Sequence, residues 1–310
     1  MIQYWFKKGN IFDIKHFLSN YNFSSVPCGF WLNSDVMRIY FSSRNKDNIS
    51  IPFRIDYNFS ELKIEEGPET IGLENGDLGL FDDSGVMPSS LIIVNGVIYL
   101  YYIGWNLGVT VPFRNSIGLA KSTDNGKTFI KSFKGPIVDR TKEEPHFCAS
   151  CCVLHEGEIF KMWYLSCVDW KKDEGNIQHR YHIKYATSSD GQNWNREGLI
   201  AIDFENENEY AISVPRVIKE HEIYKMWYSY RGSIFSSNYR IGYAESNDGI
   251  NWERKDKLID FEVSNYGWDS EMLCYPFIFD YKNERFMLYN GNEFGKTGFG
   301  LSKLIREDKL

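Results

Sequence analysis

The chain repeats one pattern of hydrophobic and polar positions five times. Each copy of fourteen residues has an apolar run, a short polar stretch and a second run that closes on an aromatic. The copies begin at Pro27, Pro88, Cys151, Pro215 and Pro276. Their closing tyrosines are 61 to 64 residues apart, at Tyr40, Tyr101, Tyr164, Tyr228 and Tyr289. Two short strands joined by a turn form a β-hairpin, so the pattern predicts five equivalent hairpins.

A third element follows at least three of the hairpins. It reads as a strand, an Asp-Gly type of turn and an aromatic that opens a fourth strand, starting at Ile117, Ile183 and Ile241. Glycine takes the positive φ of the turn, and we expect the aspartate to accept hydrogen bonds from nearby amides, at Asp124, Asp190 and Asp248. The first copy, from Ser122 to Phe129, resembles the Asp-box of sialidases. That resemblance concerns a structural turn and implies no sialidase chemistry.

Four strands in each of five units predict an all-β protein, a five-bladed β-propeller of four-stranded antiparallel blades. We expect residues 1–310 to form this one domain. The fifth blade lacks an outer strand near the C-terminal end, and the segment Gln3 to Phe6 is suited to supply it. Such pairing of the two ends closes the ring and removes an exposed edge. Long helices are not expected, and Ile14 to Leu18 predicts a short turn at most.

Composition narrows the class of protein. The 310 residues are 43% hydrophobic and 25% charged, enough for a large core, and the net charge of −7 gives no reason to expect nucleic acid. Charges interrupt the N-terminal segment and no apolar run approaches the length of a membrane span, so we expect a cytoplasmic protein without a membrane partner. The cysteines are then reduced thiols. We expect Cys148, Cys151 and Cys152 to be core residues, and neither a metal nor a cofactor.

The repeat also predicts which side chains converge. In a propeller, the start of each first strand and the loop after each second strand open on one face, where ligands bind. Five positions before each copy the residue is polar, at Asn22, Asp83, His146, Tyr210 and Glu271. Solvated loops are the alternative explanation, but five polar residues at one register favour a pocket. Arg216 lies inside an apolar first strand, where a charge is costly unless it is paired or faces a ligand.

Further candidates lie beside these strand ends. The loops after the second strands contribute Arg44, Trp105, Asp169, Arg231 and Asn292, the last followed by Glu293. Arg114, Arg180 (after His179) and Lys296 enter the third strands. Guanidinium groups bind carboxylate or phosphate, and aromatic faces stack on sugar rings. We therefore predict a small-molecule or oligosaccharide ligand with an anionic group. The alternative is that these arginines only neutralise neighbouring acids.

Five blades, polar starts of the inner strands and S-x-D-G-x-x-W turns at Ser188 and Ser246 resemble a known group of propellers. These are the five-bladed glycoside hydrolases and their relatives: the arabinanase and xylosidase family 43, the invertase-like family 32 and the phosphorylase family 130. The resemblance spans nearly the whole chain. Its motifs are structural, so it is specific for the fold and weak for the substrate.

The resemblance implies acidic residues on the inner strands of the first three blades, and the chain departs from it. Blade one offers Asn22 without a neighbouring carboxylate. Glycoside hydrolysis needs a carboxylic acid and a second carboxylate. Asp83 with Glu271 or Glu144 is the candidate pair, and His146 is a candidate proton shuttle. Neither a P-loop, a Rossmann glycine pattern nor a G-x-S-x-G elbow is present.

Three functions follow. The first is a carbohydrate-active enzyme that cleaves or transfers a glycosyl bond in an anionic or nucleotide-linked sugar. The second is a glycoside phosphorylase with one acid and a basic phosphate cradle. The third is a non-catalytic propeller that binds a glycan or a protein, which the missing acid of blade one favours.

Overall fold

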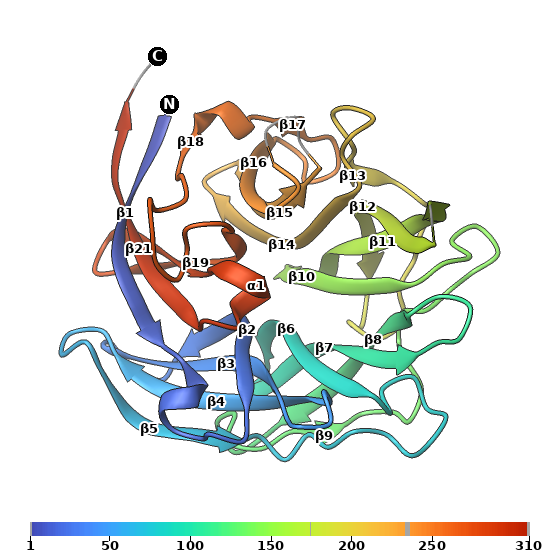
Figure 1. Ribbon diagram of the computed structural model, residues 1–310, viewed down its shortest axis with the longest axis horizontal. Coiled ribbons are helices and arrows are strands. Elements are labelled where there is room, and N and C mark those ends of the chain that lie inside the picture. Colours follow the sequence, from blue (N-terminus) through green and yellow to red (C-terminus); the bar gives the residue numbers. More distant parts are fainter. Residues whose placement is uncertain (1, 174, 233–235, 309–310) are drawn as a thin grey trace.

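The computed structural model describes residues 2–173, 175–232 and 236–308, which form five blades around a common centre (Figure 1). Blade one contains β2 (Asn22–Trp31), β3 (Val36–Arg44), β4 (Ser50–Asn58) and β5 (Lys63–Thr70). Blade two contains β6 (Gly85–Val94), β7 (Val97–Leu107), β8 (Phe113–Ser122) and β9 (Ile130–Lys131). Blade three contains β10 (Cys148–Glu156), β11 (Ile159–Asp173), β12 (Asn176–Ser188) and β13 (Ile200–Ile202). Blade four contains β14 (Ala211–Glu220), β15 (Ile223–Arg231), β16 (Arg240–Ser246) and β17 (Glu253–Arg254).

The fifth blade joins the two ends of the chain. Its strands are β19 (Cys274–Tyr281), β20 (Glu284–Asn290), β21 (Phe299–Asp308) and the N-terminal β1 (Ile2–Phe12). β1 runs antiparallel to β21, with Trp5 opposite Leu304, and the short β18 (Ile259–Asp260) pairs in parallel with its other edge (Figure 1). The predicted closure of the ring by the N-terminal strand is confirmed.

Helical segments are short. They are η1 (Ile14–His16), where the sequence predicts a turn, η2 (Asp256–Leu258) and α1 (Asn292–Gly295). No helix in the described part of the chain is long and apolar enough to cross a bilayer. All six cysteines are free and buried, including Cys148, Cys151 and Cys152 in the apolar β10, as expected of core residues.

Three Asp-Gly turns, in blades two, three and four, each contact the preceding blade. Asp190 accepts hydrogen bonds from the amides of Gln192 and Asn193, both at 2.8 Å, as predicted. The glycine of each turn then accepts a hydrogen bond from the preceding blade. The donors are Tyr40 to Gly126 at 2.7 Å, Tyr101 to Gly191 at 3.0 Å, and the indole of Trp163 to Gly249 at 2.7 Å.

These contacts correct the register of the repeat. The aromatic that reaches the next blade is the aligned Tyr40 in blade one and the aligned Tyr101 in blade two. In blade three it is Trp163, one position before the aligned Tyr164. The gap-free alignment is therefore wrong by one residue on the second strand between blades two and three.

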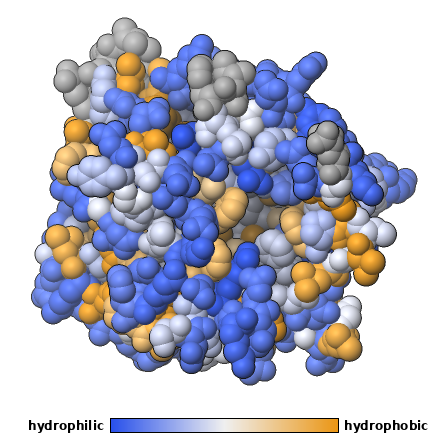
Figure 2. All heavy atoms as spheres, viewed as in Figure 1, coloured by the Kyte–Doolittle hydropathy of each residue, from blue (hydrophilic) through white to orange (hydrophobic). Residues whose placement is uncertain are grey.

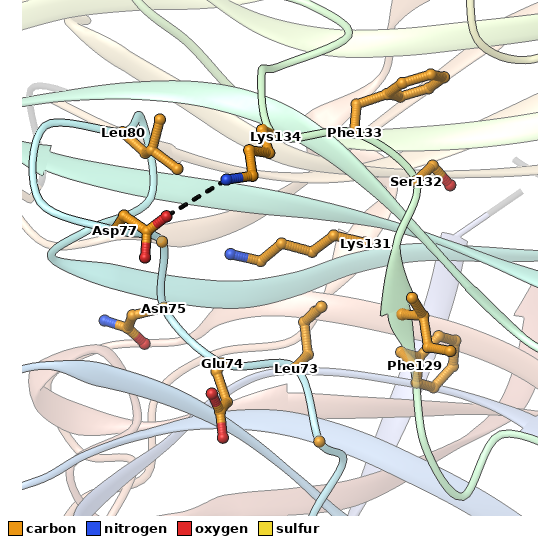
Figure 3. A pocket seen from close by; sticks show the side chains of 13 residues that line it. Leu73, Glu74, Asn75, Asp77, Leu80, Phe129, Lys131, Ser132, Phe133 and Lys134 are labelled. Atoms are coloured by element: carbon orange, nitrogen blue, oxygen red, sulfur yellow. Dashed lines mark ion pairs between the residues drawn. The ribbon is translucent and has the colours of Figure 1, made fainter.

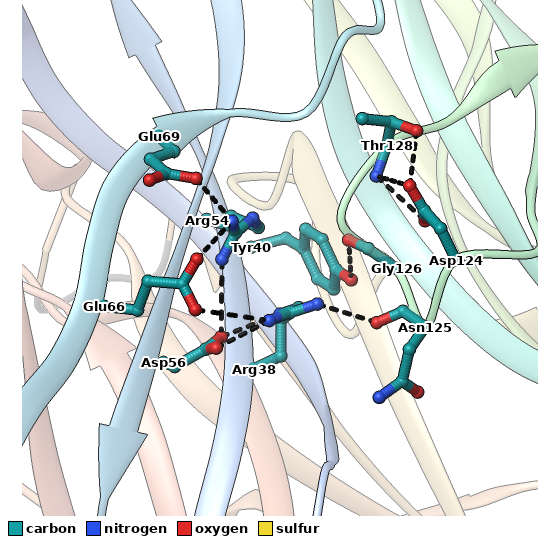
Figure 4. Close-up of polar contacts among 10 residues, drawn as sticks. All are labelled: Arg38, Tyr40, Arg54, Asp56, Glu66, Glu69, Asp124, Asn125, Gly126 and Thr128. Atoms are coloured by element: carbon teal, nitrogen blue, oxygen red, sulfur yellow. Dashed lines mark hydrogen bonds and ion pairs between the residues drawn. The ribbon is translucent and has the colours of Figure 1, made fainter.

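Buried charges secure blade one to the turn of blade two (Figure 4). Arg38 donates a bidentate pair of hydrogen bonds to the carboxylate of Asp56, at 2.7 and 2.6 Å. It also donates to the carbonyl of Asn125 at 2.7 Å. Arg54 bonds to Glu66 at 2.8 Å and to Glu69. Both buried arginines thus have acidic partners within blade one, and Arg38 also joins this blade to the turn of blade two.

The pairing of every inner strand with the second strand of its blade shifts by one residue, as at a β-bulge. The residue before the aligned proline has a positive φ at Val26, Val214 and Tyr275. Side chains of other blades hold the amides of these residues. Asn290 accepts from Val26 at 2.9 Å, and Ser229 accepts from Tyr275 at 2.7 Å. The bulge of blade five thereby positions Tyr275 at the central cavity.

Candidate active site

A cavity of about 360 Å³ opens near the centre of the face that carries α1. Figure 2 shows this face hollowed there. Side chains of all five blades line it: Phe23, Ser25, Arg44, Met87, Trp105, Phe113, His179, Tyr181, Arg231, Tyr239, Tyr275, Glu293 and Phe294. Its size suits a small ligand or one end of a longer one.

Arg44 brings the first positive charge to the cavity, from the end of β3. Its guanidinium lies 4.9 Å from the ring of Phe23 and 6.0 Å from that of Trp105, and it donates to Asn48 at 3.1 Å. Burial lowers the pKa of Arg44. A cation that loses water in this way gains from a bound anion.

Arg231 brings the second charge, from the end of β15. Its guanidinium lies over Tyr239 at 4.7 Å and Tyr210 at 5.0 Å, and one nitrogen contacts His179 at 3.2 Å. Its buried Nε has no hydrogen-bond partner among the described residues. Burial, and then the charge of Arg231, lower the pKa of His179 from 6.5 to about 4, so this imidazole is neutral at pH 7.

Tyr275 lines the same cavity as the two arginines, and burial raises the pKa of its hydroxyl well above the ordinary value. Within residues 2–173, 175–232 and 236–308, neither Arg44 nor Arg231 forms an ion pair with a carboxylate. The cavity therefore has two cations that form no ion pair with a carboxylate of the described residues.

Aromatic rings make up most of the remaining lining. The hydroxyls of Tyr181 and Tyr239 are 2.5 Å apart, and His179 stacks on Tyr181 with the ring centres 4.6 Å apart. Trp105 and Phe113 continue this lining across blade two, 4.8 Å apart. Such faces stack on sugar rings, while the arginines bind an anionic group.

Of the predicted ligand-binding residues, Arg44, Trp105 and Arg231 line the cavity. Tyr210 packs against Arg231, and Asn292 accepts hydrogen bonds from the amides of Glu271 and Met272 at 2.8 and 3.1 Å. Neither Tyr210 nor Asn292 lines the cavity itself, and four further predicted residues do not line it either: Asn22, Asp169, Arg180 and Arg216.

The positions of these four have physical reasons. Asn22 is exposed at the start of β2, and Asp169 lies opposite Arg180 in the β11–β12 hairpin. Arg180 packs over the ring of Phe204 at 4.0 Å. Arg216 lies over the ring of Phe277 at 4.3 Å and donates to a backbone carbonyl at 3.3 Å, so packing on an aromatic accommodates its charge.

The four predicted catalytic residues do not line the cavity either. Glu144 is buried and accepts hydrogen bonds from Tyr164 at 2.9 Å and Ser166 at 3.0 Å. Lys184 and Arg196 lie 3.8 and 3.7 Å from its carboxylate. The carboxylate of Glu144 is therefore held by its hydrogen bonds and neighbouring cations inside the blade, outside the lining of the central cavity.

Asp83 is also bonded within its own blade. It accepts from Ser84 at 2.7 Å, Gly79 at 3.0 Å and Asn106 at 3.0 Å. Burial alone raises its pKa, but these hydrogen bonds lower the pKa below the ordinary value of 3.8. The side chain of Glu271 is exposed, and that of His146 is half-buried. The predicted convergence of these acids does not occur at the cavity.

Sequence reasoning missed most of the aromatic lining. At the start of the third strands it selected Arg114, and Arg180 together with His179. His179 lines the cavity, whereas Phe113 lines it in place of Arg114, and Arg180 does not line it. Successive side chains of a strand point to opposite faces, so an error of one residue selects the wrong face. The remaining missed residues are Phe23, Ser25, Met87, Tyr181, Tyr239, Tyr275 and Phe294.

A second cavity, of about 460 Å³, lies beside the outer strand β9 (Figure 3). Residues 72–77, 80 and 129–134 line it, and Lys134 pairs with Asp77 at 3.6 Å. Lys131 in its wall is held by Asp82 at 2.6 Å. Only the segments around blade two and the preceding loop contribute to this cavity, so the central cavity is the better candidate.

No protein-family model matches the chain. The Uncharacterized protein Rv1502 of Mycobacterium tuberculosis is 36% identical over 302 residues, which cover 97% of this chain and 99% of that protein. The chain belongs to the Rv1502 family. A 1,2-beta-oligomannan phosphorylase of Thermoanaerobacter is 39% identical over 79 residues, 25% of this chain and 27% of that enzyme.

Solved structures share the fold of this Rv1502-family protein. A structure named "Glycoside hydrolase" superposes with a TM-score of 0.75 and 15% identity, covering 100% of this chain and 94% of the other. A structure from work on the GH130 family of mannoside phosphorylases superposes with a TM-score of 0.66 and 14% identity, covering 91% and 84%. The five-bladed fold and the resemblance to glycoside hydrolase and phosphorylase propellers are confirmed.

Proposed function

We propose that the protein is a glycoside phosphorylase, which transfers a glycosyl group from an oligosaccharide to inorganic phosphate in the central cavity. The observation that carries this proposal is the pair Arg44 and Arg231 on one cavity, neither with an acidic partner in the described part of the chain. Two guanidinium groups match the geometry and charge of a phosphate dianion. Tyr275 lines the same cavity and is a candidate hydrogen-bond donor to the phosphate.

The number of carboxylates in the cavity lining favours phosphorolysis over hydrolysis. Hydrolysis by the common route needs one carboxylic acid and a second carboxylate that activates water or attacks the sugar. Phosphate is its own nucleophile, so phosphorolysis needs only the acid. The cavity has one carboxylic acid among its lining residues, Glu293. The partial similarity to an oligomannan phosphorylase supports the same reaction.

The test is a phosphate-dependent assay with β-1,2-linked oligomannosides, followed by other oligosaccharides, with release of sugar phosphate as the readout. We expect turnover with phosphate and none with water alone. Arg231→Ala and Arg44→Ala should each weaken phosphate binding about 10- to 100-fold, because a charge-assisted hydrogen bond contributes roughly 1.5–3 kcal/mol. Arg180→Ala, which removes an arginine outside the cavity, should leave phosphate binding unchanged. Phosphate that neither binds nor is consumed contradicts the proposal.

The second candidate is a propeller that binds an anionic glycan without reacting with it. The absence of Asp83, Glu144 and Glu271 from the cavity lining favours this function. It predicts glycan binding that is lost in Arg231→Ala, with no turnover of any saccharide in the presence of phosphate.

A further inference from the structure

We propose that Glu293 is the catalytic acid of this protein. It is supplied by blade five, whereas the resemblance to glycoside hydrolase propellers implies acids on the first three blades. This inference rests on the proposed glycosyl transfer. Among the thirteen residues that line the cavity, Glu293 is the one with a carboxylic acid.

The segment that carries Glu293 crosses the centre of the molecule. α1 follows β20 and lies in front of the central region in Figure 1. Ser25 of blade one donates to the carbonyl of Phe294 at 2.5 Å. Phe294 packs edge-on against Tyr239 of blade four, with the ring centres 6.0 Å apart. Three blades therefore hold this segment over the cavity.

The backbone of the segment is strained at the acid. Glu293 has φ 52° and ψ 42°, and Phe294 has φ 61° and ψ 30°. This left-handed conformation is unfavourable for a residue other than glycine, because its Cβ approaches the following carbonyl oxygen. Such strain persists only where surrounding contacts impose it, and it is concentrated at functional sites. Asn292 supplies part of this restraint. Its side-chain oxygen accepts hydrogen bonds from the amides of Glu271 and Met272, which precede β19.

The side chain of Glu293 is accessible to solvent. It is 59% exposed, and its carboxylate accepts a hydrogen bond from Lys296 at 2.5 Å. The ring of the adjacent Phe294 lies 5.5 Å from the guanidinium of Arg231, which we assign to phosphate. Glu293 therefore lines the same cavity as the guanidinium that we assign to phosphate.

The reaction then balances as follows. An oxygen of hydrogen phosphate forms a bond to the anomeric carbon while the bond from that carbon to the glycosidic oxygen breaks. The carboxyl proton of Glu293 passes to the departing oxygen, which becomes a hydroxyl. The proton that the hydrogen phosphate carried returns to Glu293, leaving the sugar phosphate and the shortened saccharide.

The test compares full-length wild type and Glu293→Gln for turnover and for phosphate binding by calorimetry. We expect Glu293→Gln to lose turnover by about 10²- to 10⁴-fold, the usual contribution of a general acid, and to retain phosphate affinity within about threefold. An aryl glycoside with an acidic leaving group needs no proton, so the variant should recover most of its rate on that substrate. Glu284→Gln, at an exposed ion pair with Lys303, is the control and should keep the wild-type rate.

Contrary outcomes separate the two proposals. A Glu293→Gln variant with full turnover, or one equally slow on the aryl glycoside, contradicts the role of Glu293 while the proposed function stands. Wild-type protein without phosphate-dependent turnover contradicts the proposed function, and the assignment of Glu293 with it.

Discussion

At the scale of single residues, three buried carboxylates share one environment. Each of these carboxylates accepts a hydrogen bond from the hydroxyl of a tyrosine twenty residues later. The distances are 3.1 Å for Asp82, 2.9 Å for Glu144 and 3.0 Å for Asp269. Each also lies beside a cation, for example Lys131 at 2.6 Å from Asp82 and Lys7 at 2.8 Å from Asp269. This repetition in three blades indicates that Glu144 stabilises the blade.

We expect Glu144→Gln to lower the free energy of unfolding by roughly 3–5 kcal/mol, because it leaves buried positive charge without its partner. Glu271→Gln, at an exposed side chain, should change it by less than about 0.5 kcal/mol. Urea unfolding followed by tryptophan fluorescence measures both. A Glu144→Gln protein of wild-type stability would show that the carboxylate has another role.

At the scale of elements, the Asp-Gly turn joins two strands of its own blade and also contacts the preceding blade. Asp124 accepts from the amide of Thr128 at 3.1 Å and from its hydroxyl at 2.6 Å. Ser122 bonds to both Asp124 and the amide of Gly126, whose carbonyl holds Tyr40 of blade one. The turn must therefore keep its shape for the two blades to stay in contact.

The turn gives a pH dependence of stability. Burial alone raises the pKa of Asp124, but hydrogen bonds from Ser122 and Thr128 lower it from 3.8 to about 2. Because the folded-state pKa is the lower one, this stabilisation is complete above about pH 4 and is lost as the pH falls toward 2. Asp124→Asn should cost about 1 kcal/mol at pH 7 and flatten the dependence between pH 4 and 2. Unfolding measured across this range checks the prediction, with Asp47→Asn in an exposed loop as the control. An unchanged acid dependence in Asp124→Asn would contradict it.

At the scale of the whole molecule, the N-terminal strand closes the ring and also connects blade five to blade four. The buried side chain of Gln3 accepts hydrogen bonds from Trp5 at 3.3 Å and from Trp227 of blade four at 3.0 Å. β1 also covers the edge of β21. An open edge would invite pairing with other chains.

Trp5→Ala should therefore lower the free energy of unfolding by about 3–5 kcal/mol, the usual cost of removing a large buried aromatic. Phe6→Ala on the same strand, with a side chain 51% exposed, should cost less than about 0.5 kcal/mol. Thermal unfolding measures the difference, and size-exclusion chromatography detects aggregation. Equal effects of the two substitutions would contradict the role of β1 in closing the ring.

The sequence by itself determined the blades, their strand order, the Asp-Gly turns and the closure by β1. These features depend on local hydrophobic alternation and on turn residues, which repeat along the chain. It also placed Arg44, Trp105 and Arg231 at the site, because each ends or follows a second strand and so lies on the ligand face.

Only the tertiary structure decided the rest of the site. Side chains alternate with a period of two, so a shift of one residue selected Arg114 in place of Phe113, and of the neighbours His179 and Arg180 His179 alone lines the cavity. The bulge that positions Tyr275 depends on an amide partner from another blade, Ser229. Contacts with blades one and four bring Glu293 over the cavity. Such contacts join residues far apart in the chain, and no local pattern of hydrophobic and polar positions encodes them.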